Sequence, residues 1–68
     1  MNIDVWVERG NVKKKIRHEK DMRIFDVLEM LKISPETIVA VRNGEVALED
    51  EPLEAGDRLE LRAVKMPG

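Results

Sequence analysis

Few residues of this 68-residue chain could do chemistry, and they lie far apart. His18 is the only histidine and Ser34 the only serine, so a Ser-His-Asp triad would need both. The two flank opposite ends of the helix predicted below, which argues against hydrolase chemistry, and we expect His18 to be a solvated connector residue. Cysteine is absent, which excludes disulfides, thiolate nucleophiles and cysteine-based metal sites. We therefore predict no catalytic residues inside this chain, which we expect not to be an enzyme.

The sequence also gives little support for a phosphate-binding or metal-binding site. The four glycines stand too far apart to form a phosphate-binding loop: Gly10, Gly44, Gly56 and Gly68. Four acidic residues gather in one stretch: Glu49, Asp50, Glu51 and Glu54. They could hold a hard cation, but they lack the spacing of a calcium loop, so a solvated loop is favoured. We expect neither a bound cofactor nor a metal ion.

Charge and hydropathy limit the partners. Charged residues make up 38% of the chain, yet the formal net charge is only −2, so we expect no binding to nucleic acid or membrane. The start of the chain lacks the features of a secretory signal, and no apolar run approaches the roughly 20 residues of a membrane span. We expect a cytoplasmic monomer. A basic ribbon could dock an acidic partner or phosphate, although a solvated, edge-protecting strand is favoured: Lys13, Lys14, Lys15 and Arg17.

Hydrophobic periodicity predicts the elements of the first half. Alternating residues predict strands at 3–7 and 12–17, joined by a turn at Arg9-Gly10-Asn11. A stripe at helical spacing then predicts an amphipathic helix of about three turns: Ile24, Val27, Leu28 and Leu31. The helix ends before Ser34-Pro35, because the residue before proline avoids the α region. Asp21 or Arg23 could cap it, and we expect Met22 and Met30 to fill the core.

The second half predicts three further strands. Residues 37–42 are rich in β-branched side chains and lead into Asn43-Gly44, a strong hairpin signal, with a brief strand returning over 45–48. Both faces of residues 38–41 are apolar, which leaves their orientation open. A turn at Ala55-Gly56-Asp57 precedes a last strand that ends near Val64.

The element order β-β-α-β-β-β predicts an α+β fold of the β-grasp (ubiquitin-like) type. In this fold one helix packs across a mixed sheet, here of four to five strands. We expect a single domain over residues 1–64 and a flexible C-terminal tail over residues 65–68.

Three segments carry a resemblance to a known family. Val39-Ala40-Val41-Arg42-Asn43-Gly44-Glu45-Val46 resembles a "V-x-V-N-G" hairpin, and Leu53-Glu54-Ala55-Gly56-Asp57-Arg58-Leu59-Glu60-Leu61 resembles "L-x-x-G-D-x-(I/L/V)-x-(I/L/V)". Ile24-Phe25-Asp26-Val27-Leu28 resembles "V-x-D-L-L". Over essentially its whole length the chain resembles the ThiS/MoaD family, the ubiquitin-like sulfur carriers of thiamin and molybdopterin synthesis. The length after Asp57 places Gly68 in register with the family's terminal glycine.

The resemblance implies a function for the tail. A partner, an E1-like adenylating enzyme, uses ATP to activate the carboxylate of Gly68, and sulfur then replaces AMP to give a thiocarboxylate for a downstream sulfur-accepting enzyme. Met66 and Pro67 would present the glycine to the partner. The family ends in Gly-Gly, whereas Pro67 here fixes φ and removes a backbone donor. This departure leaves open slower activation, a differently shaped partner or a lost activity.

A docking surface is also implied. If the first strand alternates, Trp6 lies on the opposite face from Ile3, Val5 and Val7 as an exposed aromatic residue. We expect Trp6, Arg62 and Val64 to contribute to partner binding, although Trp6 could merely cover its own sheet. Two other functions remain open. One is a β-grasp binding module of the TGS type, without a reactive terminus, and the other is a degenerate carrier kept as a regulatory or structural subunit.

Overall fold

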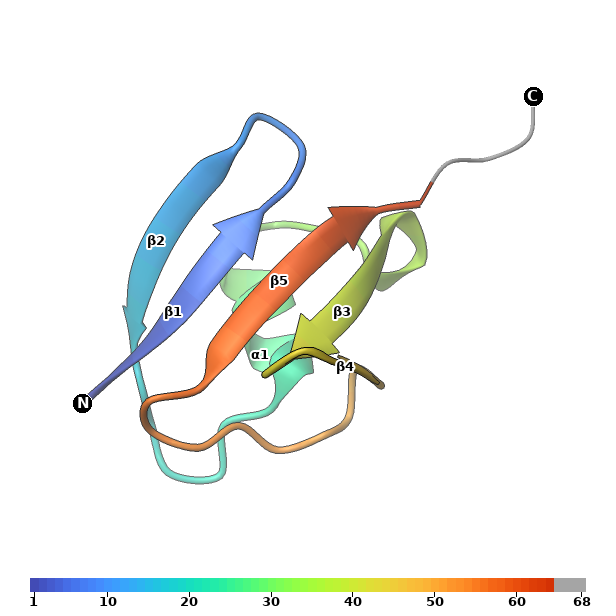
Figure 1. Ribbon diagram of the computed structural model, residues 1–68. Coiled ribbons are helices and arrows are strands. Elements are labelled where there is room, and N and C mark those ends of the chain that lie inside the picture. The colour runs from blue at the N-terminus through green and yellow to red at the C-terminus, as the bar shows by residue number, and fades with distance from the viewer. Residues whose placement is uncertain (65–68) are drawn as a thin grey trace.

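The computed structural model describes residues 1–64 of the chain. These residues form a five-stranded mixed sheet with one α-helix across one face and a short 3-10 helix at its margin (Figure 1). The elements are β1 (Asn2–Val7), β2 (Val12–Arg17), α1 (Ile24–Met30), η1 (Pro35–Thr37), β3 (Ile38–Arg42), β4 (Glu45–Ala47) and β5 (Arg58–Ala63). The predicted β-grasp fold is confirmed, with five strands in the sheet.

The last strand of the chain lies in the middle of the sheet. The strand order is β2-β1-β5-β3-β4. β5 runs parallel to β1 and antiparallel to β3, while the outer strands β2 and β4 form antiparallel hairpins with their neighbours. The path of β5 therefore carries the chain across the centre of the sheet to its last described residues (Figure 1).

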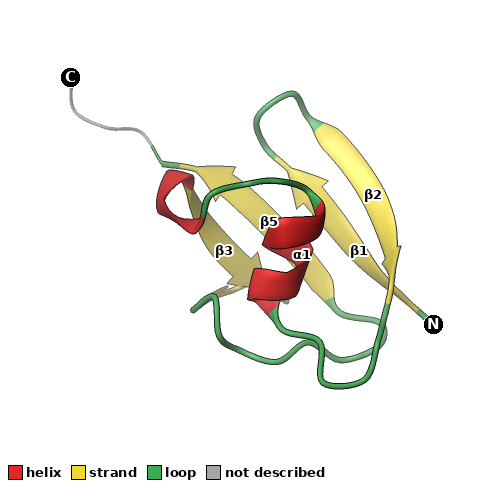
Figure 2. Ribbon diagram, turned by 180° about the vertical axis from the view of Figure 1, so that it is seen from behind, coloured by secondary structure: helices red, strands yellow, loops and turns green. Residues whose placement is uncertain are grey.

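The core lies between the sheet and α1. Figure 2 shows α1 lying across one face of the sheet. Alternate residues of the strands point to that face, and the apolar stripe of the helix packs against them. The largest fully buried side chains come from both layers: Ile3, Val5, Ile24, Val27, Leu28, Leu59 and Leu61. One face of the sheet is thus covered by α1, and the other face is not covered by a helix.

The structure decides the orientation of β3, which the sequence leaves open. Ala40 pairs with Leu61 of β5, and both side chains are buried under the helix. Strand alternation then places Val39 and Val41 on the opposite, helix-free face. Val39 keeps 40% of its surface exposed, in agreement with this placement.

Two capping motifs fix the ends of α1. Arg23 occupies the N-cap position, and its backbone N–H donates to the carboxylate of Asp26 at 2.8 Å. At the other end Ile33 N–H donates to the Leu28 carbonyl at 2.9 Å, and Lys32 N–H donates to the Glu29 carbonyl at 3.1 Å. This is a Schellman motif, with Lys32 in the left-handed conformation at φ +56°. It ends the helix at Met30, one turn earlier than predicted.

Three further sequence expectations are corrected. His18 is half-buried rather than solvated, and its Nε2–H donates to the Leu53 carbonyl at 2.8 Å. Met22 is buried as expected, but Met30 is 59% exposed, because its position on α1 lies off the apolar stripe that packs against the sheet. The strand predicted over residues 37–42 begins one residue later, at Ile38, because Thr37 is the last residue of the 3-10 helix. Within residues 1–64, no helix is both long and apolar enough to cross a bilayer.

Candidate functional site

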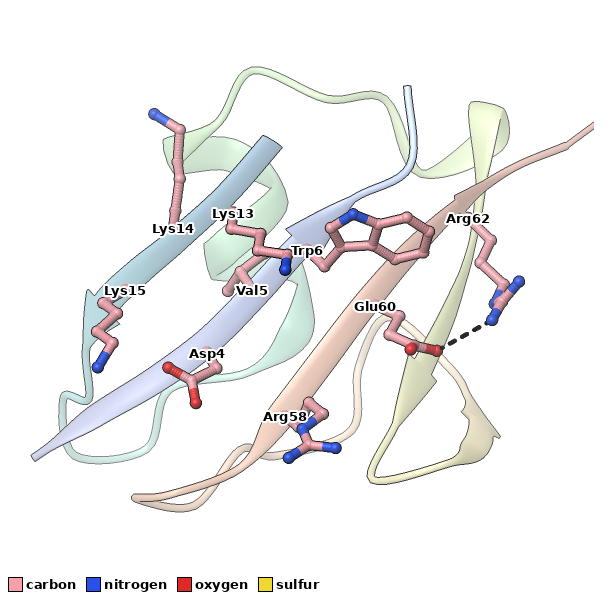
Figure 3. Close-up of a pocket in the computed structure, with 9 residues that line it drawn as sticks. All are labelled: Asp4, Val5, Trp6, Lys13, Lys14, Lys15, Arg58, Glu60 and Arg62. Atoms are coloured by element: carbon pink, nitrogen blue, oxygen red, sulfur yellow. Dashed lines mark hydrogen bonds and ion pairs between the residues drawn. The ribbon is translucent and has the colours of Figure 1, made fainter. Parts of the chain in front are cut away.

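The helix-free face of the sheet carries the aromatic and charged side chains that could bind a partner. The β1–β2 and β1–β5 registers place Trp6 between Lys13 and Glu60, and the same registers place Asp4 between Lys15 and Arg58. Because neighbours in register point to the same side, these six side chains form two short rows across β2, β1 and β5. Figure 3 shows them together with Arg62, which follows on β5. We call this surface the outer face.

Trp6 and Arg62, both predicted as docking residues, lie against each other. The guanidinium carbon of Arg62 is 5.8 Å from the centre of the Trp6 ring, within range of a cation–π contact. The indole N–H donates to Asn11 Oδ1 at 2.7 Å, which ties the ring to the β1–β2 turn. Arg62 also pairs with Glu60 at 3.4 Å. Trp6 is half-buried rather than fully exposed, so its ring is held in one place before any partner arrives.

The outer face is hollowed beside Trp6. The hollow has a volume of about 650 Å³, and four basic but only two acidic side chains of the outer face border it. The basic residues are Lys13, Lys15, Arg58 and Arg62, and the acidic residues are Asp4 and Glu60. Lys14 is in register with Val5, so its side chain points to the other side of the sheet. The whole chain carries a formal net charge of −2, so positive charge is concentrated here against the overall balance. Such a surface attracts a negatively charged partner.

An apolar strip continues the outer face toward β4. Val39 and Val41 point to this side, and Val41 pairs directly with Val46 of β4. The exposed fraction is 40% for Val39 and 75% for Val46. An aromatic ring, a basic hollow and exposed valines therefore share one side of one sheet. Interfaces between proteins combine apolar and charged groups in this way.

The remaining predicted site residues lie at or beyond the end of β5. Val64 is half-buried, is not among the residues lining the hollow, and donates its N–H to the Thr37 carbonyl at 3.1 Å. The structure thus brings Trp6 and Arg62 together but places Val64 beside η1. Met66, Pro67 and Gly68 lie outside the described residues.

A buried carboxylate joins two of the three segments that carried the family resemblance. Asp57 is only 7% exposed and accepts hydrogen bonds from Arg42 Nε at 2.7 Å, Asn43 Nδ2 at 3.0 Å and the Glu54 N–H at 2.7 Å. Burial alone raises the pKa of this carboxyl, but the three donors outweigh it and hold the pKa below its usual range. The hydrogen bond to Asp57 correspondingly raises the pKa of Arg42.

This cluster supports the site without being a reactive centre. Asn43 Oδ1 accepts the N–H of Arg58, the first residue of β5, at 2.9 Å. Together with Asp57, it fixes the β3–β4 turn against the start of the strand that leads to the tail. The sequence showed these residues only as two separate turn motifs, and nothing local indicated that they meet. Among residues 1–64, no three carboxylate or histidine groups are placed to hold a metal ion.

Comparison with known proteins gives one family and several similar folds. The sequence model of the ThiS family matches residues 6–61. The solution structure of the Haloferax volcanii HVO 2177 protein aligns with a TM-score of 0.78 and 16% identity, over 100% of this chain and 87% of that one. A ubiquitin-like protein from the hyperthermophilic archaeon Caldiarchaeum subterraneum aligns with a TM-score of 0.64 and 17% identity, over 97% and 99% of the two chains. A structure described as Caldiarchaeum subterraneum ubiquitin gives a TM-score of 0.62 and 18% identity, over 100% and 98%. At these identities the structural likeness shows the fold.

Proposed function

The chain belongs to the ThiS family, and from this premise we propose that it is a ubiquitin-like sulfur carrier or protein modifier whose Gly68 carboxylate is activated by a partner enzyme. The family match, which covers the body of the domain, carries the proposal. In this function the chain is a substrate and carrier rather than a catalyst.

The proposed chemistry begins with the carboxylate of Gly68. A carboxylate is a poor electrophile until one oxygen becomes part of a good leaving group. An E1-like adenylating enzyme would supply ATP; the carboxylate oxygen attacks the α-phosphorus, pyrophosphate leaves, and an acyl adenylate forms. Sulfide then attacks the acyl carbon, the acyl–phosphate bond breaks as AMP leaves, a proton is released, and the product is a thiocarboxylate. Glycine suits this step because an acyl carbon without a neighbouring Cβ is open to attack.

The arrangement of β5 supports this proposal. Arg62 on β5 lies against Trp6 on the outer face, and the chain reaches Val64 two residues later. A partner that covers the outer face would therefore meet the chain just before residues 65–68. We propose that Trp6 and Arg62 dock the adenylating enzyme, that Val64 lies at the margin of that contact, and that Met66 and Pro67 carry Gly68 into the active site.

The basic hollow indicates the charge of the docking partner. Four basic side chains border the hollow beside Trp6, so an acidic segment of the adenylating enzyme fits this surface best. The valines on the same face would meet apolar side chains beside that segment. Because the reaction consumes ATP, the proposal places the chain in the cytoplasm. The thiocarboxylate would serve thiamin synthesis, molybdopterin synthesis or tRNA thiolation, each through its own downstream enzyme.

Pro67 makes the proposal specific to this chain. A proline before the last glycine holds φ near −65° and gives the partner no N–H at that position. An extended channel accepts this φ, so the activating enzyme would bond other backbone groups of the tail. An enzyme that depends on the missing donor would act slowly.

Mass spectrometry of the intact chain tests the proposal directly. The chain is incubated with the adenylating enzyme of the same organism, ATP and sulfide, and we expect the mass increase of one oxygen-to-sulfur replacement. Fragmentation should place the sulfur on Gly68, and reactions without ATP or with Gly68 deleted should give no product. If an enzyme that activates its other carriers leaves this chain unchanged, the proposal is wrong.

A binding module remains the second candidate because the outer face forms a surface that does not need the tail. A module of this kind would keep its partner affinity and its biological role after deletion of Gly68. A carrier would keep the affinity but lose the role. The same deletion therefore distinguishes the two functions.

A further inference from the structure

The end of β5 is held by a side-chain hydrogen bond at the point where the regular backbone ladder between β1 and β5 stops. The N–H of Glu8, the residue after β1, donates to the Leu61 carbonyl at 3.0 Å. In a regular parallel pair the next donor on β5, Ala63 N–H, would bond the backbone carbonyl of Glu8. That carbonyl instead accepts the N–H of Asn11 at 3.0 Å, because the chain turns into the β1–β2 hairpin. The regular ladder therefore offers Ala63 no partner.

The side chain of Glu8 fills this gap. Its Oε1 accepts the Ala63 N–H at 3.0 Å, across 55 residues of sequence. The other oxygen, Oε2, is 3.8 Å from Nη1 of Arg62. Since Arg62 is half exposed to solvent, this ion pair contributes little to stability. The carboxylate thus acts mainly as a substitute for the missing backbone acceptor.

The next residue is held from the opposite side. Val64 N–H donates to the Thr37 carbonyl at 3.1 Å. Thr37 itself is fixed in η1, where both its N–H and its hydroxyl donate to the Ser34 carbonyl, at 3.1 and 2.7 Å. Successive N–H groups of a strand point to opposite edges. The contacts from Glu8 and Thr37 therefore keep the chain extended through Val64, one residue beyond β5.

From these contacts we propose that Glu8 is a positioning residue for the tail. By holding Ala63 N–H, it fixes the point and direction at which the chain leaves the sheet, and so the starting point of the tail that carries Gly68 to the partner. This inference rests on the proposed carrier function. Losing the bond would leave the end of β5 held only on its β3 side, through the hydrogen bond from Val64 to Thr37, and no longer held on its β1 side.

A strand end held on one side only matters because activation needs close placement of the carboxylate. A misplacement of about 1 Å at a reacting group costs up to a hundredfold in rate. Glu8 does not line the basic hollow, and its one contact with a docking residue is the weak, solvent-exposed ion pair with Arg62. Its removal should therefore lower turnover and leave the concentration for half-saturation nearly unchanged. A fall in kcat with little change in KM distinguishes a positioning role from a docking role.

The experiment compares the wild-type chain with Glu8→Ala, Glu8→Gln and the control Glu29→Ala, which removes a carboxylate from α1. The first measurement is amide hydrogen exchange by NMR. We expect exchange at Ala63 to accelerate roughly three- to tenfold in Glu8→Ala, the effect of one hydrogen bond. Exchange at Leu59 should stay the same. Glu8→Gln keeps an oxygen acceptor and should resemble wild type, as should Glu29→Ala. Unchanged exchange at Ala63 in Glu8→Ala would overturn the contact itself.

The second measurement is adenylate formation by the activating enzyme, followed as ATP–pyrophosphate exchange over a range of carrier concentrations. We expect kcat to fall roughly tenfold in Glu8→Ala, with KM within about twofold and near wild-type values for Glu8→Gln. An unchanged kcat, or a loss confined to KM, would overturn the positioning role. If the wild-type chain forms no adenylate, the proposed function fails and positioning fails with it, while amide exchange still decides whether Glu8 holds Ala63.

Discussion

Asp57 and Arg42 form a hydrogen-bonded ion pair, 2.7 Å between Oδ2 and Nε, that joins the end of β3 to the residue before β5. The carboxylate is nearly buried, whereas the side chain of Arg42 keeps 26% of its surface exposed. The pair therefore gains strength from burial on one side while the guanidinium keeps part of its hydration. It secures the strand that carries Arg62 and leads to the tail.

Asp57→Ala should destabilise the fold strongly. The substitution leaves Arg42, the Asn43 amide and the Glu54 N–H without their shared acceptor. We expect the free energy of unfolding to fall by about 2–4 kcal/mol, a large part of what a domain of this size has. Urea denaturation followed by circular dichroism measures this. Asp50→Ala removes an exposed carboxylate from the acidic loop and should change stability by less than about 0.5 kcal/mol; an equal loss in both variants would contradict the role of the cluster.

The lowered pKa of Asp57 predicts a dependence of stability on pH. Folding favours the ionised carboxyl of Asp57. Its contribution to the free energy of unfolding is therefore fully present above the pKa of an unfolded-chain aspartate, about 3.9. It is lost as the pH falls through the lower folded-state pKa. The difference in unfolding free energy between wild type and Asp57→Asn should therefore be constant near pH 7 and shrink below about pH 4. Urea midpoints across this range provide the measurement. A difference that stays constant into strong acid would show that the charge of Asp57 is not involved.

Local patterns predicted the strands well because each signal lies within a few residues. The positive φ angles of Asn43 and Gly44, +50° and +87°, are those that a two-residue hairpin needs, and the Asn-Gly pair predicted that turn. Strand alternation likewise predicted Trp6 on the helix-free face. In both cases backbone geometry within one short segment decides the outcome.

Contacts between distant segments could not be predicted in this way. The ring of His18 bonds a carbonyl 35 residues away, and the carboxylate of Glu8 bonds an N–H 55 residues away. Neither partner is marked by its residue type, because both are backbone groups. The helix end was missed for a different reason: its left-handed position is taken by Lys32 rather than by the glycine that usually marks it.

Lys32→Gly should stabilise the protein. Lys32 adopts φ +56° at the end of α1, a conformation that costs residues with a Cβ atom but not glycine. We expect the free energy of unfolding to rise by about 0.5–1 kcal/mol, although glycine also loosens the unfolded chain. Thermal or urea denaturation measures the change. Lys20→Gly is the matched control, since Lys20 is exposed and is not among the residues with positive φ. It should be neutral or destabilising, and a gain of equal size there would contradict the explanation.

Substitutions in the basic hollow should weaken binding to the adenylating enzyme in a salt-dependent way. Lys13 and Arg58 both line the hollow beside Trp6, so Lys13→Glu with Arg58→Glu reverses its charge where we propose that an acidic segment docks. We expect the dissociation constant to rise roughly tenfold or more at low salt, mainly through slower association, and the difference to shrink at high salt as the charges are screened.

Trp6→Ala tests the aromatic part of the same surface. A charge reversal outside the hollow, Lys20→Glu, is the control for the charge reversals inside it. Removing the ring should cost about 2 kcal/mol of binding free energy at any salt concentration, because apolar burial is not screened by ions. Lys20→Glu changes the charge by the same amount per residue but lies outside the hollow, so it should leave binding close to wild type. Calorimetric titration at two salt concentrations separates these effects. Equal weakening per reversed charge in Lys20→Glu and in the Lys13→Glu, Arg58→Glu variant would mean that overall charge, rather than the outer face, governs the encounter.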